Sequence, residues 1–199
     1  KSCTVRNIKH ENGKLSFGCR EKSLPMPVTS AFLKAYKLVP LTRELNNETL
    51  AFTGLPQGEY TLFIDKQKVV SADAAAWVKG INLAVLKTPM QKQAIAVNSL
   101  INKKRSAEAK LRNVRDMEIQ IRNVKVDIAD QAAREKYLKD FLTKTQTSRY
   151  SRYYAALVKS YRTNKPKENK LLETISKMNA AIYQQNKPEK HHFLLKQNS

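Results

Sequence analysis

The residue types most often used in catalysis are few in this sequence and lie far apart. The chain of 199 residues has three histidines, His10, His191 and His192, and two cysteines, Cys3 and Cys19. No Asp precedes a histidine by two or three residues. The sequence also lacks a phosphate-binding glycine loop, a His-Glu-x-x-His segment, paired Cys-x-x-Cys motifs and a Gly-x-Ser-x-Gly turn. It therefore predicts no catalytic residue, no cofactor-binding residue and no metal ligand in this chain.

The adjacent histidines near the C-terminal end could in principle bind a metal ion. They follow Pro188 in a segment predicted to be extended, residues 191–195. Neighbouring residues of an extended chain point to opposite sides, so His191 and His192 cannot both face one ion without a bend. We therefore expect both to be ordinary surface residues.

The two cysteines could form a disulfide, because both fall on one face of a predicted hairpin. Alternating apolar residues around Asn12-Gly13 predict two antiparallel strands within residues 3–22. A three-residue loop, Glu11 to Gly13, would place odd-numbered residues opposite odd-numbered residues and so bring Cys3 and Cys19 close together. On this pattern a disulfide and two free thiols are equally open.

Arginine alternates with aromatic residues in one segment, residues 149–154, and this pattern occurs in proteins that bind single-stranded nucleic acid. At helical spacing, however, Tyr150, Tyr154, Leu157 and Tyr161 fall on one side of a helix. We expect these residues to form a packing face with tyrosines at its margin.

The strands and helices predicted around these residues indicate an α+β fold. Residues 1–87 are predicted to form a small antiparallel β module, which contains the hairpin, an extended proline-containing segment and a meander. The predicted meander elements are strands over residues 49–53 and 60–65 around the turn at 54–58, a return strand at 68–70 after a Lys66-Gln67 turn, and a short helix over 72–79 closed by Gly80.

Residues 88–199 are predicted to form a helical hairpin or a three-helix coiled bundle with a short extended tail. Thr88 and Pro89 are typical of the first residues of a helix. Apolar residues then recur every seven positions from Leu100 to Ile128, with Leu111, Met117 and Val124 on the adjoining stripe. We expect Val114 and Ile121 on this seam to be buried against the later helices, and among their residues against Leu171, Ile175, Met178 or Ile182.

The chain is strongly basic, with 37 Lys and Arg against 17 Asp and Glu and a formal net charge of +20. Most of the excess lies after residue 90. Such a charge attracts acidic polymers and anionic surfaces, including nucleic acid, without specifying any of them. The apolar runs are far shorter than the roughly 20 residues of a membrane-spanning helix, so the sequence predicts no such helix. Apolar residues recur throughout the chain, which excludes a low-complexity disordered chain.

Three segments of the sequence resemble the region that follows the catalytic core in secreted bacterial hydrolases of the SGNH/GDSL type. They are residues 54–65, 80–84 and 88–94, in this order and spacing. The residues that carry the resemblance are Gly54, Leu55, Gly58, Tyr60, Leu62, Ile64, Asp65, Gly80, Asn82, Leu83, Pro89 and Gln93. A segment like residues 24–27 and a tail like residues 187–195 also occur in that group. One departure is that the turn after Asp65 lacks the usual glycine.

The resemblance implies a non-catalytic C-terminal region of a secreted or envelope esterase-like protein that acts on acylated carbohydrate. The serine nucleophile, the oxyanion residues and the Asp-x-x-His pair of that group belong to segments with no counterpart here. Such a region would pack on a catalytic core or a neighbouring chain and mediate assembly or attachment. Two other functions are open: a basic nucleic-acid- or ribosome-associated protein, and a freestanding structural protein of an envelope or large assembly.

Overall fold

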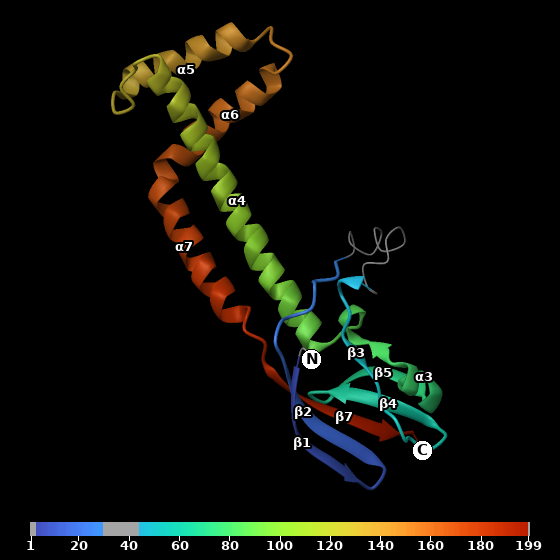
Figure 1. Cartoon of the computed structure of the whole chain (residues 1–199). Helices are drawn as coiled ribbons and strands as arrows, with labels where there is room; N and C mark the ends of the chain where they lie inside the picture. The colour runs from blue at the N-terminus through green and yellow to red at the C-terminus, as the bar shows by residue number, and fades with distance from the viewer. Residues whose placement is uncertain (1–2, 30–43, 199) are drawn as a thin grey trace. The chain divides into compact units, whose positions relative to one another are not determined.

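The computed structural model describes residues 3–29 and 44–198, and their fold is α+β (Figure 1). The chain divides into two compact units. The first contains residues 1–99 and 182–199, and the second contains residues 100–181. The predicted segment 88–199 is thus distributed over both units, with the boundaries inside helices α4 and α7.

A five-stranded antiparallel sheet is the centre of the first unit. Its strands are β1 (Cys3–Glu11), β2 (Lys14–Glu21), β4 (Glu59–Ile64), β5 (Gln67–Asp73) and β7 (Lys190–Gln197), in the order β1-β2-β7-β4-β5. The C-terminal tail therefore forms the middle strand, where Figure 1 shows β7 in red between β2 and β4. The tail predicted to be extended is strand β7, which joins the two hairpins into one sheet.

The hairpin β1-β2 forms as predicted, but by a different turn. Glu11 pairs with Lys14, so the loop has two residues, Asn12 and Gly13, both with positive φ, and not the three expected. A bulge at Asn7 and Ile8 then shifts the register by one residue, after which Val5 pairs with Cys19. The bulge restores the odd-to-odd pairing that the longer loop was expected to give.

The meander is shorter than predicted at its first strand. Only Thr49–Leu50 forms a strand, β3, and it pairs with β6 (Ile81–Asn82) in a separate two-stranded sheet. The turn between β4 and β5 consists of Asp65 and Lys66, one residue earlier than expected, with φ values of 48° and 69°. Helix α3 (Ala74–Lys79) ends at Gly80 as predicted, and a short 3-10 turn, η1 (Leu83–Val85), follows β6.

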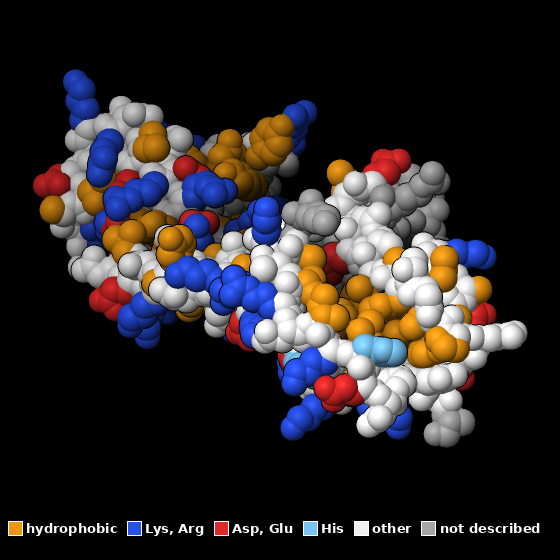
Figure 2. Space-filling model, turned by 60° about the horizontal axis from the view of Figure 1, so that its bottom comes forward, with side chains coloured by type: hydrophobic (Ala, Val, Ile, Leu, Met, Phe, Trp, Pro, Cys, Tyr) orange, Lys and Arg blue, Asp and Glu red, His pale blue; other side chains and the backbone are white. Residues whose placement is uncertain are grey.

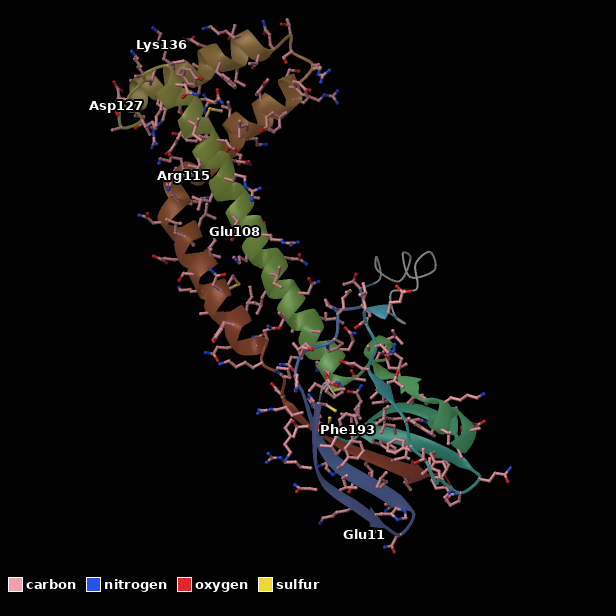
Figure 3. All side chains as sticks on the ribbon, in the orientation of Figure 1. Glu11, Glu108, Arg115, Asp127, Lys136 and Phe193 are labelled. Carbon is pink, nitrogen blue, oxygen red and sulfur yellow. The ribbon has the colours of Figure 1, made fainter. Side chains whose placement is uncertain are left out.

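The core of the first unit lies on one face of the five-stranded sheet. Alternate residues of β4 and β7 supply it, and Trp77 of α3 is fully buried in it. The rings of Phe17 and Phe193 stack with centroids 5.0 Å apart, and Figure 3 labels Phe193 on β7. Helix α4 begins at the predicted cap, where the backbone N–H of Gln91 donates to Thr88 Oγ1 at 3.1 Å.

The second unit is helical. Helix α4 (Pro89–Asn123) continues into it and is followed by α5 (Gln131–Thr145), α6 (Ser151–Asn164), the 3-10 turn η2 (Lys165–Lys167) and α7 (Glu168–Gln185). Its core contains Val114, Met117 and Ile121 of α4, packed with Leu138 of α5 and with Leu157, Val158 and Tyr161 of α6. Val114 and Ile121 are fully buried, as predicted.

The partners of this seam differ from the expectation. The seam is buried against later helices, as predicted, but these helices are α5 and α6. The particular partners predicted, Leu171, Ile175, Met178 and Ile182 of α7, are wrong, because no residue of α7 belongs to this core. Val124 lies past the end of α4 and is 53% exposed. The predicted tyrosine face is confirmed at Leu157 and Tyr161, whereas Tyr150 and Tyr153 are exposed.

Candidate functional site

A pocket of about 520 Å³ lies in the first unit, beside the end of β2. Segments 23–26 and 45–50 form its other walls. The residues that give it chemical character are the carboxyls of Glu21 and Glu48, the thiols of Cys3 and Cys19, and the rings of Phe17 and Phe193. Acids and thiols thus share one hollow with aromatic side chains. In Figure 2, hydrophobic side chains gather on a face of this unit, whereas Lys and Arg are spread over the helices.

Amide side chains hold the two loop segments of the pocket in place. The Asn46 side chain accepts from Met26 N at 2.9 Å and donates to Met26 O at 3.2 Å. Gln91 of α4 donates to Met26 O at 3.1 Å and accepts from Val28 N at 3.0 Å. Asn82 of β6 accepts from Glu48 N at 2.9 Å and donates to Asn46 O at 3.0 Å. Paired donors and acceptors of this kind fix backbone that has no strand partner of its own.

The carboxyls of Glu21 and Glu48 hydrogen-bond to one another. Burial raises the pKa of both, and together with the neighbouring Glu21 it brings the pKa of Glu48 to about 8. Two carboxyl groups in contact cannot both ionise at neutral pH, so the pair retains one proton and one negative charge. Neither residue takes part in an ion pair found among residues 3–29 and 44–198.

The two cysteines are free thiols in this structure and hydrogen-bond to each other. Cys3 pairs with Glu21 and Val5 pairs with Cys19, which places the cysteines diagonally, two residues apart on the same face. Burial and the neighbouring Cys3, Glu21 and Glu48 raise the pKa of Cys19 to about 12. Its thiol is therefore protonated at neutral pH, and a nucleophile of the cysteine-hydrolase type needs the thiolate.

His191 occupies the buried face of β7, next to the thiols. It pairs directly with Cys19 across β2 and β7, and its side chain is 7% exposed. Nδ1 lies 2.6 Å from Asp65 Oδ2, while Asp65 Oδ1 accepts from the backbone N–H of His192 at 2.8 Å. The expectation of two surface histidines is thus wrong for His191, because β7 is an inner strand whose odd-numbered residues face the core.

Most residues that carry the family resemblance have a structural role. Asp65 fixes β7 at the β4-β5 turn, and the Gln93 side chain donates to the carbonyls of Gln185 and Lys187, just before β7. Gly80 closes α3 with φ 90° against Thr49. Tyr60, Leu62, Ile64 and Leu83 are core residues. The other motif residues are Gly54 and Gly58 with positive φ, Leu55 packed on the core, Asn82 in the amide network and Pro89 at the start of α4.

In the second unit, basic residues surround one buried acid. Glu118, 2% exposed, forms ion pairs with Arg115, Arg122 and Lys165. Lys165 and Arg115 also pair with Glu168. The hydrogen bond from Lys165 lowers the pKa of Glu168, against the effect of burial. Several of the basic side chains that contribute to the net charge are thus engaged within the unit. Figure 3 labels Arg115 and Glu108 along α4.

Over residues 3–29 and 44–198, no group of three or more His, Cys, Asp and Glu side chains could hold a metal ion. No helix in these ranges is both long and apolar enough to cross a bilayer.

Sequence reasoning placed Cys3 and Cys19 together but did not identify Glu21 and Glu48 as a pair. Their contact depends on where the segment before β3 returns to the end of β2, which no local pattern specifies. The one available signal was the alternation of β2, since Phe17, Cys19 and Glu21 share a face and an acid at the end of an apolar row is unusual.

The fold of this chain is similar to that of a solved enzyme structure. No family model and no curated protein matches the sequence. The chain is similar to the solved structure of a gut microbial diltiazem-metabolizing enzyme, with a TM-score of 0.78 and 26% sequence identity. The match covers 100% of this chain but 46% of that one, so the chain spans less than half the length of the enzyme it matches.

Proposed function

We propose that this chain is the non-catalytic C-terminal region of a secreted hydrolase similar to the SGNH/GDSL type. It packs on a catalytic core or a neighbouring chain and mediates assembly or attachment. The observation that carries the proposal is the structural match, in which the whole of this fold corresponds to 46% of an enzyme. The remainder of that enzyme provides room for a catalytic part. The resemblance of residues 54–65, 80–84 and 88–94 to such hydrolases supports the same assignment.

The chemistry of the described pocket is consistent with this role. The Cys19 thiol is protonated at neutral pH, and the Glu21–Glu48 pair shares a proton within its own hydrogen bond. Neither group is prepared to attack an ester carbonyl, because nucleophilic catalysis needs an ionised or base-activated nucleophile. The ordered amide network and the central position of β7 stabilise this unit, as expected of a region on which a catalytic core or a neighbouring chain packs.

The test compares this chain with the protein encoded by the complete reading frame. Both are incubated with p-nitrophenyl acetate, an acetylated polysaccharide and diltiazem, and product formation is followed. We expect the longer protein to hydrolyse an ester and this chain, checked for folding by circular dichroism, to have no saturable activity. A reading frame without a Gly-Asp-Ser-like segment, or saturable ester hydrolysis by this chain alone, would overturn the proposal.

A further inference from the structure

The pocket beside β2 contains two buried carboxyl oxygens, Oε2 of Glu21 and Oε2 of Glu48, that have no hydrogen-bond partner among the described residues. The Glu21–Glu48 pair retains one proton and one charge at neutral pH, and it forms no ion pair with a Lys or Arg of the described residues. A charge held in a hollow with apolar walls is costly unless a partner neutralises it.

A second buried polar group near this charge also lacks a partner. Nε2 of His191 is buried and makes no hydrogen bond within the described part of the chain. The His191 side chain is 7% exposed, lies on the same sheet face as Cys19 and Phe17 of the pocket wall, and interacts electrostatically with Glu21. Nδ1 is hydrogen-bonded to Asp65, so Nε2 is the ring nitrogen that remains for a further hydrogen bond. The unpartnered carboxyl oxygens of the acid pair thus favour a ligand group that donates N–H bonds.

We propose that this pocket binds an organic ammonium ion with an apolar, preferably aromatic, body. The ammonium group would donate to the carboxyls of Glu21 and Glu48, and the body would lie against the stacked rings of Phe17 and Phe193. A volume of about 520 Å³ admits a small molecule with one or two rings. The inference does not depend on the proposed function.

A metal ion is a poorer occupant than an ammonium ion. The described residues form no group of three or more metal-binding side chains, and Ca²⁺ requires six or more oxygen ligands. An ammonium ion needs only acceptors for its N–H bonds and tolerates apolar neighbours around its carbon atoms.

The binding has a distinctive dependence on pH. An ammonium ion that donates to both carboxyls takes the place of the shared proton, so that binding releases this proton to solvent. The groups that face the pair are Cys3, Cys19 and His191. Because the pKa of Glu48 is about 8, the affinity should rise as the pH is raised from about 6 to 8, while the amine stays protonated.

The test measures binding of 2-phenylethylamine to the full chain by isothermal titration calorimetry. The neutral isostere 2-phenylethanol and the anion 3-phenylpropanoate are the comparison ligands. We expect the amine to bind at least about tenfold more tightly than the alcohol at pH 7.5, with proton release detected in buffers of different ionisation enthalpy. Glu48→Gln should reduce amine affinity about tenfold, and Glu21→Gln serves as a second variant if the first fails to fold. The matched control is Glu11→Gln at the exposed tip of β1-β2, labelled in Figure 3, which should change nothing.

Any one of the following results would overturn the inference. Equal binding of amine and alcohol would define an apolar cavity without charge selectivity. Amine binding that is unaffected by Glu48→Gln and Glu21→Gln would place the ligand elsewhere on the chain. An amine affinity that does not change between pH 6 and pH 8 would show that the shared proton is not displaced. No saturable amine binding would mean that the pocket has a different occupant.

Discussion

At the scale of single residues, Asp65 links the β4-β5 turn to β7. Its carboxylate accepts from the backbone N–H of His192 and bonds to the ring of His191. Burial opposes ionisation, but these hydrogen bonds and the two histidines outweigh it and lower the pKa of Asp65. A group whose pKa is lower in the folded state stabilises the protein above its unfolded pKa, and this stabilisation is lost as the pH falls through the folded pKa.

We therefore expect Asp65→Asn to destabilise the chain at pH 7 by about 1 kcal/mol, because a charge-assisted hydrogen bond is replaced by a neutral one. Asn tolerates the positive φ of 48° at this position, so the turn itself is kept. The difference in unfolding free energy between wild type and variant should shrink as the pH falls toward 3. Urea denaturation at both pH values measures it, with Glu11→Gln as the control. A difference that is the same at both pH values would contradict the assignment.

The second residue-scale prediction concerns Cys3 and Cys19, which lie diagonally and contact each other as thiols. We expect them to form a disulfide when the protein matures outside the cytoplasm, the location that the proposed function implies. Closing a loop of this length stabilises a protein by roughly 3 kcal/mol in the chain-entropy model. Mass spectrometry of non-reduced native protein should show a loss of two hydrogens, absent from a Cys3→Ser variant. Two alkylatable thiols in native material would contradict the prediction.

At the scale of elements, the β4-β5 turn lacks the glycine that its backbone favours. Asp65 and Lys66 both have positive φ, and Lys66 has 69°. A left-handed conformation costs a residue with a Cβ atom roughly 1–2 kcal/mol relative to glycine.

Lys66→Gly should therefore stabilise the chain by up to about 1 kcal/mol, after allowing for the greater flexibility of glycine in the unfolded state. Lys68→Gly, within β5, is the matched control and should destabilise, because its residue has extended backbone. The thermal unfolding midpoints of wild type and of both variants, measured in one buffer, test this prediction. A lower midpoint for Lys66→Gly would show that the turn does not carry this strain.

Helix α4 packs through a narrow stripe in the second unit, where Ile121 is fully buried and Ile119 is 51% exposed. Ile121→Ala should destabilise the helical unit by about 2–5 kcal/mol, since it leaves a cavity among Leu138, Leu157 and Tyr161. Ile121→Asp, which places a charge in the same core, should prevent the unit from folding. Ile119→Ala is the control from the same helix, expected within about 0.5 kcal/mol of wild type. Urea denaturation followed by circular dichroism distinguishes these variants, and equal midpoints for Ile121→Ala and Ile119→Ala would refute the assigned face.

At the scale of the whole molecule, the net charge of +20 predicts attraction to polyanions of any type. Ion pairs within the chain neutralise part of this positive charge. Lys104 pairs with Glu108, and Arg115 and Arg122 pair with Glu118. The partly exposed pair of Lys104 with Glu108 contributes little to stability. All of these pairs reduce the positive charge available to a partner.

We expect single-stranded RNA, duplex DNA and heparin to bind similarly at 50 mM salt and to lose most affinity by 200 mM. A Tyr150→Ala, Tyr153→Ala double variant tests base stacking, because both rings are exposed. The proposed function predicts that the double variant binds RNA as wild type does. Nanomolar RNA binding at 200 mM salt that is lost in the double variant, with the fold intact, would favour the nucleic-acid alternative. Fluorescence anisotropy provides the measurement.

Structural features that depend only on neighbouring residues could be predicted from the sequence. Asn12-Gly13 specifies the tight turn of the first hairpin, Gly80 ends α3, and Thr88-Pro89 starts α4, because each residue type has a backbone conformation or hydrogen bond that acts within a few positions. The spacing of Val114 and Ile121 likewise specified which side of α4 is buried.

Which strands and helices pack together could not be predicted from local sequence patterns, because it depends on contacts between distant segments. The tail could have remained at the surface, but insertion of β7 between β2 and β4 pairs backbone groups that would otherwise lie at two sheet edges, and this buries His191. The amphipathic stripe of α4 fits either α5 and α6 or α7, since apolar faces of similar spacing are interchangeable until loops and helix lengths are set. The contact of Glu21 with Glu48 is a consequence of long-range pairing of this kind, in which the energy depends on the arrangement of the whole unit and on no local pattern.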